Sequence, residues 1–133
     1  MIVLDASAAV DYLIDNEPRA TWVTEHVLAD GQSLHAPSLL DVEVASALWQ
    51  LHRRGSITVR RAEQALGDLL KLRVHRYQHR PLLARMWRLR DSVRMSDSAY
   101  VALAELLGAP LVTTDARLSR YAGHQAQIEA FDG

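Results

Sequence analysis

The sequence contains no cysteine, and this absence excludes both a disulfide scaffold and a zinc site built from thiolates. It also has no apolar stretch that approaches the roughly 20 residues of a membrane-spanning helix. The segment Met1–Asp5 has neither the basic start nor the long apolar run of a signal peptide. We therefore expect a cytoplasmic protein without membrane contact.

Glycine and proline are scarce, with six Gly and four Pro, and no linker, internal repeat or low-complexity segment divides the chain. The 133 residues, of which 49% are hydrophobic, are enough to bury a core. We predict a single domain over residues 1–133.

The net charge of −1 hides an uneven distribution of charge along the chain. Residues 1–51 contain eight acids and one Arg, residues 52–94 contain twelve bases and three acids, and residues 95–133 contain five acids and two bases. One interpretation is a basic surface beside an acidic pocket, and the other is an ordinary solvated helix surface. All bases except Lys71 are Arg, which suits bidentate contact with phosphate, although a GC-rich genome produces the same bias.

Short apolar runs alternate with helical patterns along the chain. The runs predict buried parallel strands, because a strand covered on both faces shows no polar alternation. The predicted strands are Met1–Leu4, Ser33–Ala36, Arg73–Tyr77, Leu111–Thr114 and Gln127–Ala130. The predicted helices are Ala8–Ile14, Pro18–Ala29, Leu39–Arg54, Val59–Leu72, Leu82–Val93, Asp97–Leu107 and Ala116–Tyr121, with N-caps from Ser38, Thr58 and Ser96.

Strands that alternate with helices of this length indicate an α/β fold. We predict a three-layer α/β/α sandwich with a central, mainly parallel sheet of four to five strands and helices on both faces. In open sheets of this kind ligands bind outside the carboxyl ends of the strands, where the strand order reverses. Asp5 and Asp115 each follow a predicted strand.

Both of these acids have an ordinary alternative explanation, because Asp at the end of a strand is a good N-cap for the next helix. Glu43 is harder to dismiss, since it lies at the edge of the apolar face of its helix with no Lys or Arg within one turn. A carboxylate in that position needs a hydrogen bond, a metal ion or water. Asp41 lies at the other edge of the same face, but the helix dipole explains an acid in the first turn, so we favour Glu43.

Asp97 begins a strongly apolar helix, where dipole compensation again offers an alternative. If the fold brings all four acids together, they form an uncompensated negative cluster. Carboxylates a few ångströms apart resist joint ionisation unless a cation lies between them or some of them keep a proton. Oxygen ligands without His or Cys favour Mg²⁺ or Mn²⁺ over zinc. Sites of this kind usually serve phosphoryl chemistry.

The sequence patterns of other chemistries are absent. No GxSxG, GxxxxGK[ST] or GxGxxG sequence occurs, which removes the serine hydrolase, P-loop and dinucleotide-binding interpretations. His75 and His79 have the i, i+4 spacing of zinc ligands, but HExxH is missing and Pro81 follows closely.

Four segments carry the candidate acids in a fixed order. They are Val3–Ser7 (VLDAS), Ala36–Leu48 (APSLLDVEVASAL), Ser96–Ala104 (SDSAYVALA) and Leu111–Leu118 (LVTTDARL). Each segment alone is a weak signal, but together, in this order, they resemble the PIN-domain ribonucleases and specifically the VapC toxins of bacterial toxin–antitoxin pairs. The resemblance extends over essentially the whole chain.

The resemblance implies a PIN-like sandwich and a Mg²⁺-dependent endoribonuclease, in which Mn²⁺ is a possible substitute. Such a toxin is silenced by a cognate VapB antitoxin and is usually a homodimer. The implied catalytic and metal-binding residues are Asp5, Glu43, Asp97 and Asp115, with Ser7 and Thr114 as supporting polar groups. The middle helices would contact RNA or the antitoxin, and the arginines concerned are Arg53, Arg54, Arg60 and Arg61. Some relatives have a further acid where this chain has Ala116–Leu118, so the number of metals is not fixed.

Three alternatives stay open. A PIN nuclease of RNA processing would have no antitoxin gene beside its own. A catalytically silent binding module would have little physical reason to keep four unpaired acids together. A phosphoryl-accepting Rossmann-like domain fits less well, because Ser7 stands where a haloacid dehalogenase needs its second Asp, and the paired acids and Lys of a receiver domain are missing.

Overall fold

The sheet at the centre of the computed structural model, which describes all of residues 1–133, has the strand order β3-β2-β1-β4-β5. Every neighbouring pair of strands is parallel. The strands are β1 (Ile2–Leu4), β2 (Leu34–Pro37), β3 (Val74–Tyr77), β4 (Leu111–Thr113) and β5 (Ile128–Ala130). All five predicted strands are confirmed to within one residue at each end.

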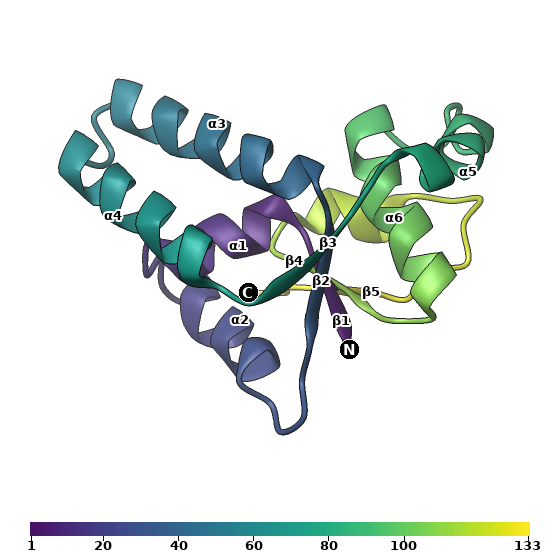
Figure 1. The fold of residues 1–133 in the computed structure, drawn as a ribbon, viewed down its shortest axis with the longest axis horizontal. Helices are drawn as coiled ribbons and strands as arrows, with labels where there is room; N and C mark the ends of the chain where they lie inside the picture. Colours follow the sequence, from purple (N-terminus) through teal and green to yellow (C-terminus); the bar gives the residue numbers. More distant parts are fainter.

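Helices cover both faces of this sheet (Figure 1). On one side α1 packs against α2, α3 and α4, and on the other side α6 packs against β1, β2 and β4 with α5 beside it. The helices are α1 (Ala6–Leu13), α2 (Arg19–Val27), α3 (Leu39–Arg53), α4 (Val59–Lys71), α5 (Leu83–Arg88) and α6 (Met95–Leu107), and two short 3₁₀ helices are η1 (Arg80–Leu82) and η2 (Ala116–Arg120). The predicted three-layer sandwich is confirmed.

The core lies on both faces of β1, β2 and β4, whose residues are buried along their whole length. Helix α6 is buried without a break from Ser98 to Ala104. A helix that is apolar nearly all round belongs in the interior, which is why the sequence of α6 lacks a clear polar face. No helix in the structure is long and apolar enough to cross a bilayer.

Two helix starts confirm or correct the expected caps. Thr58 caps α4 as predicted, and its hydroxyl accepts a hydrogen bond of 3.1 Å from the Arg61 amide. Ser38 makes no side-chain capping bond at α3. The Leu39 amide instead donates to Nε2 of His79 at 3.0 Å, so the cap of α3 comes from a turn 40 residues further along the chain.

Two other helices differ from the sequence pattern at their ends. Helix α6 begins at Met95, so Ser96 lies inside the first turn and does not cap the helix. Helix α5 ends at Arg88, although the pattern predicted a helix as far as Val93. Leu89 and Val93 are both buried beyond its end, so the apolar spacing continues through a turn that is not helical.

The strand order reverses at β1, which lies between β2 and β4. Leu4 of β1 is in register with Val112 of β4, so these two strands end at the same edge of the sheet. Asp5 and Asp115 follow at that edge. The fold thus creates the crevice in which open α/β sheets bind ligands, and both acids lie at it.

Candidate active site

Asp5 lies directly after β1 and is only 5% exposed. Its Oδ1 accepts hydrogen bonds from the Ala8 amide at 2.9 Å and the Ser7 hydroxyl at 2.8 Å, and its Oδ2 accepts one from the Thr113 hydroxyl. Burial raises the pKa of Asp5 to about 6, and the charge of Asp97 adds to this, although the three donors oppose it. Asp5 is therefore a helix cap, but a carboxylate has further lone pairs, so capping does not exclude a ligand role.

Glu43 lies near the start of α3, and its Oε1 accepts a hydrogen bond of 2.6 Å from the hydroxyl of Tyr100. Burial raises the pKa of Glu43, as does the charge of Asp97, while the Tyr100 hydroxyl and the charge of Arg94 lower it. The role of Tyr100 was not predicted from the sequence. A signal was present, because Tyr100 follows Asp97 by three residues on α6 and so shares its helix face.

Asp97 acts on both of these acids through its charge. It lies in the first turn of α6, and its Oδ2 accepts a hydrogen bond of 2.7 Å from the hydroxyl of Tyr121. Its negative charge raises the pKa of both Asp5 and Glu43. The three carboxylates therefore lie near enough for the charge of Asp97 to act on the other two, although they come from three different parts of the fold.

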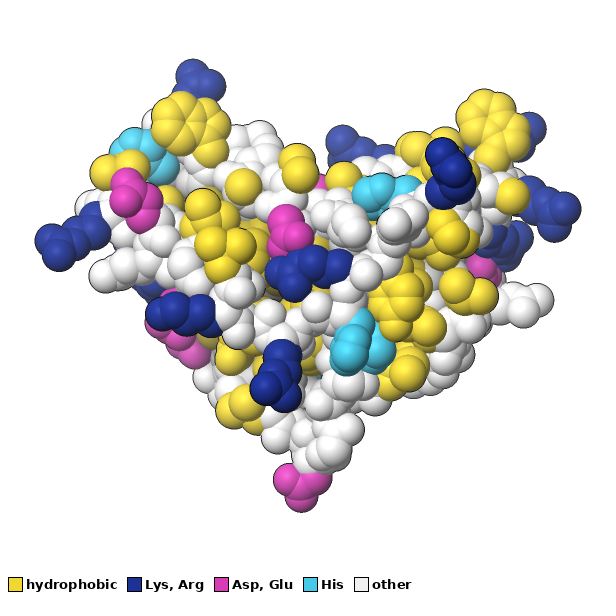
Figure 2. Space-filling model, viewed as in Figure 1, with side chains coloured by type: hydrophobic (Ala, Val, Ile, Leu, Met, Phe, Trp, Pro, Cys, Tyr) yellow, Lys and Arg dark blue, Asp and Glu magenta, His cyan; other side chains and the backbone are white.

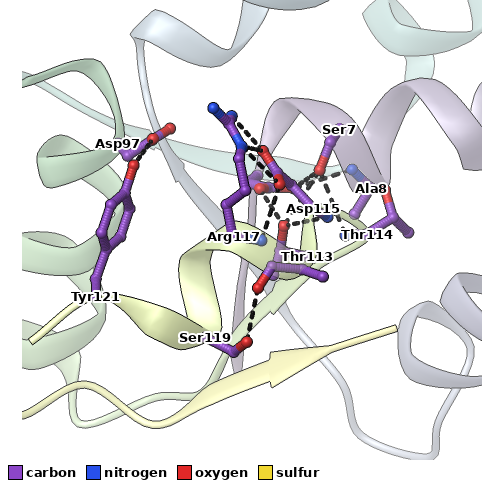
Figure 3. A network of polar contacts seen from close by, with 11 residues as sticks. Ser7, Ala8, Asp97, Thr113, Thr114, Asp115, Arg117, Ser119 and Tyr121 are labelled. Carbon is purple, nitrogen blue, oxygen red and sulfur yellow. Dashed lines mark hydrogen bonds and ion pairs between the residues drawn. The ribbon is translucent and has the colours of Figure 1, made fainter. Parts of the chain in front are cut away.

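Asp115 is held differently from the other three acids. Its Oδ1 accepts hydrogen bonds from the amide and Nε of Arg117, and its Oδ2 accepts one from Nη2 of the same side chain (Figure 3). This ion pair lowers the pKa of Asp115. Arg117 also feels the charge of Asp97, so the pair lies beside the rest of the cluster. The expectation of four uncompensated acids is thus wrong for Asp115.

Thr113 occupies the centre of the hydrogen-bond network drawn in Figure 3. Its buried hydroxyl donates to Asp5 and accepts from the Asp115 amide at 2.9 Å. Thr114, which sequence reasoning placed beside Asp115, donates instead to Asp11 at 2.6 Å. Because β4 is buried on both faces, its sequence shows no alternation of polar and apolar residues. The sequence therefore does not show which of the two threonines faces Asp5.

Replacing Thr113 with Val should lower the free energy of unfolding by about 1–3 kcal/mol, because the buried Asp5 carboxylate loses a donor without a change in side-chain shape. The matched variant Thr114→Val, at a half-buried position one residue away, should cost clearly less. Urea unfolding at pH 7.5 measures both. Equal losses for the two variants would contradict the central position given to Thr113.

No three acidic or histidine side chains converge closely enough to hold a metal ion as they stand. Each of the four acids faces its own donor: hydroxyl groups and an amide for Asp5, a tyrosine each for Glu43 and Asp97, and Arg117 for Asp115. A cation at this site must therefore compete with hydroxyl and guanidinium donors of the chain itself.

Asp41, the alternative to Glu43, lies outside this cluster. Its two carboxylate oxygens accept hydrogen bonds of 2.7 and 2.9 Å from Nε and Nη2 of Arg76 on β3. A fork-to-fork pair of this kind accounts for Asp41 without a metal.

The basic middle segment, residues 52–94, is partly neutralised by acids of the segments before and after it, residues 1–51 and 95–133. Arg61 pairs with Asp15 and also donates to the Leu13 carbonyl, and Arg85 pairs with Glu105. Arg53, Arg54 and Arg60 are exposed and belong to none of the ion pairs. On the face shown in Figure 2 the basic side chains are spread in separate groups, with the densest group on the side of α5, so they do not form one continuous stripe.

The family model of the PIN domain matches residues 2–124 of this sequence. The chain belongs to the PIN-domain family. Within it, the chain is 41% identical to Ribonuclease VapC12 of Mycobacterium tuberculosis over 97% of its own length and 98% of that protein. The resemblance to VapC proteins that the four segments indicated is therefore confirmed.

Solved structures agree with the PIN fold. The chain superposes on the VapBC2 structure from Rickettsia felis, which is bound to a DNA fragment from its promoter, with a TM-score of 0.70. That match covers 99% of this chain and 100% of the other at 17% identity. VapC20 of M. tuberculosis, a toxin that cleaves the Sarcin-Ricin loop, matches with a TM-score of 0.69 and 17% identity over 94% of this chain and 97% of that one.

Proposed function

We propose that this PIN-domain protein is the toxin of a type II toxin–antitoxin pair and acts as a Mg²⁺- or Mn²⁺-dependent endoribonuclease. The sequence identity of 41% with Ribonuclease VapC12, over 97% of this chain, supports RNA as the substrate. The observation that carries the proposal is the position of Asp97, whose charge acts on both Asp5 and Glu43 at the switch point of the sheet.

The donor set fits a hard divalent cation. All four acids offer oxygen ligands, which Mg²⁺ and Mn²⁺ prefer. The raised pKa of Asp5 and of Glu43 means that the ionised form of each is disfavoured in the absence of a cation, so a cation would relieve a cost already present. Asp5, Glu43, Asp97 and Asp115 would hold the ion. When bound, it supplies Lewis acidity toward the phosphate and a water of lowered pKa.

The surrounding residues position the acids. The Ser7 and Thr113 hydroxyls fix the rotamer of Asp5, and the Tyr100 hydroxyl fixes that of Glu43. Tyr121 does the same for Asp97. Such outer partners orient ligands and typically change metal affinity 10- to 100-fold when they are removed.

We propose a VapB-type antitoxin and a second copy of the chain as protein partners, and the cytoplasm as the location. The VapBC2 relative is a toxin–antitoxin assembly, which supports the antitoxin. Trp87 on α5 is 61% exposed and Trp49 on α3 is 58% exposed, and large apolar side chains left in water support protein interfaces on both helices.

Purified chain incubated with total RNA, followed by sequencing of new 5′ ends, tests the enzymatic part. We expect discrete ends in Mg²⁺ and none in EDTA. Cleavage that persists in EDTA, or no cleavage at all, contradicts the proposal. If the neighbouring gene encodes no small DNA-binding protein that binds the chain, the RNA-processing alternative replaces the toxin assignment.

Removal of Arg117 should strengthen metal binding. Both oxygens of Asp115 accept hydrogen bonds from Arg117, so a cation has to displace this side chain. In Arg117→Ala we expect Mn²⁺ to bind about two- to fivefold more tightly, the range for a largely exposed ion pair. Arg120→Ala is the control, because Arg120 lowers the pKa of Asp115 through charge alone. Equal effects of the two variants in a Mn²⁺ titration would contradict direct competition.

A further inference from the structure

A groove of about 410 Å³ opens from the candidate active site between α1 and α3. These two helices lie side by side (Figure 1). The α3 side of the groove is one helix stripe that starts at Glu43 and continues to Arg54, just beyond the end of the helix. At 1.5 Å per residue this stripe is about 16 Å long. The groove therefore leads away from the catalytic acids, and Ser7 and Glu43 belong to both.

The floor of this α1–α3 groove is apolar. It is lined by Val10 and Ile14 of the α1 segment and by Ala47 and Leu51 of α3. Ile14, Ala47 and Leu51 are only half-buried, so the floor keeps apolar surface in contact with water. The groove volume lies in the range of roughly 300–1,000 Å³ that is typical of small-ligand sites. A flat group with apolar faces would remove this surface from water.

The rim is polar and contains two amides. Nδ2 of Asn16 donates to Asp11 at 2.7 Å, which fixes the Asn16 amide beside the groove. Gln50 and Arg54 line the opposite wall and are exposed. Arg54 belongs to none of the ion pairs of the chain. Side-chain amides pair with the edges of nucleobases, and Arg binds phosphate or stacks on bases.

We infer that the α1–α3 groove receives the base of one unpaired RNA nucleotide next to the scissile phosphate. The base packs on the apolar floor, Gln50 and Asn16 hydrogen-bond to its edge, and Arg54 contacts the adjoining backbone. This inference rests on the proposed ribonuclease activity, because continuity with the catalytic acids is what brings an RNA strand to the groove. An occupied groove would make cleavage depend on the identity of one flanking base.

The test separates binding from cleavage. The variant Asp97→Asn, mixed in EDTA with a pool of random 12-nucleotide RNAs, is recovered with its bound RNA, which is then sequenced. We expect one base to be enriched at one position. Adding Gln50→Ala to this variant should reduce that enrichment at least about fivefold, the lower end for one bidentate base contact. Gln64→Ala is the matched control, since Gln64 is exposed on α4 and outside the groove, and it should keep the enrichment.

Arg54→Ala provides a second variant. It should weaken binding of all sequences alike and reduce the salt dependence by about one phosphate contact, whereas Arg88→Ala, at an exposed position on α5, should not.

The same enrichment with and without Gln50, or no enrichment at any position, overturns the inference. It is also overturned if Ala47→Phe, which fills the groove, leaves RNA binding intact but abolishes binding of the antitoxin, because the groove would then hold a peptide. These results differ from a failure of the proposed function, in which the wild-type chain cuts no RNA in Mg²⁺.

Discussion

Asp97→Asn is expected to lower the rate of Mg²⁺-dependent RNA cleavage at least about a thousandfold, which corresponds to about 4 kcal/mol of lost transition-state stabilisation. Asp97 is the acid whose charge acts on both Asp5 and Glu43, so its removal breaks the cluster at its centre. The fold should survive, because an Asn oxygen can still accept the hydrogen bond from Tyr121.

Initial rates on one RNA at saturating Mg²⁺, together with circular dichroism spectra, measure this effect. Asp91→Asn is the matched control, since Asp91 is an exposed acid outside the cluster, and it should cleave at the wild-type rate. A folded Asp97→Asn protein with a rate within threefold of wild type would remove Asp97 from the catalytic site.

Asp5→Asn is expected to have two opposite effects: cleavage falls at least about a thousandfold, and the metal-free protein becomes more stable. The pKa of Asp5 is about 6 in the folded chain, against an ordinary value of 3.8. The folded state therefore holds the proton more tightly than the unfolded state does. The contribution of Asp5 to stability is therefore most favourable below pH 4 and is lost as the pH rises from about 4 to above 6.

At pH 8 the full cost of burying the charged carboxylate is present in the wild type and absent in the variant. Two pKa units correspond to about 2.7 kcal/mol. The amide has one accepting oxygen where the carboxylate has two, so one of the three donors loses its acceptor, and this reduces the expected gain to about 1–2 kcal/mol. At pH 4.5 the gain should shrink. Thermal unfolding in EDTA at the two pH values measures it, and a variant less stable than wild type at pH 8 would contradict the account.

The five strands and the edge at which they place Asp5 and Asp115 could be predicted from sequence. Short apolar runs are marked off by breaks such as the one at Pro110, and an acid directly after a strand needs no knowledge of distant contacts. The spacing of apolar residues along α3 was also enough to single out Glu43, because a carboxylate at the edge of an apolar face is unusual in any helix.

Long-range partners could not be predicted. Tyr121 reaches Asp97 across 24 residues, and Thr113 reaches Asp5 across 108 residues. No periodic pattern within one element encodes such pairs. Arg117 was visible in the sequence, two residues after Asp115, but this spacing alone does not show that the side chain folds back onto the carboxylate.

The charge distribution along the sequence indicated where the candidate acids lie, but it overstated the positive charge that residues 52–94 carry in the folded chain. The acidic N-terminal segment does contain Asp5 and Glu43, and the basic middle segment contains neither. Part of that basic charge is cancelled in the folded chain, since Arg61 and Arg76 pair with acids of the N-terminal segment. Arg54, at the end of the α1–α3 groove, is the arginine whose free guanidinium is best placed for RNA.

Binding of Mn²⁺, followed by electron paramagnetic resonance, tests most directly whether the carboxylates form one metal centre. The account predicts that wild-type protein at pH 7.5 reduces the signal of free Mn²⁺ in a saturable manner and that Mg²⁺ reverses this. It predicts at least tenfold weaker binding in Asp97→Asn, with no change in Asp91→Asn. Saturable binding of equal strength in wild type and Asp97→Asn would contradict it.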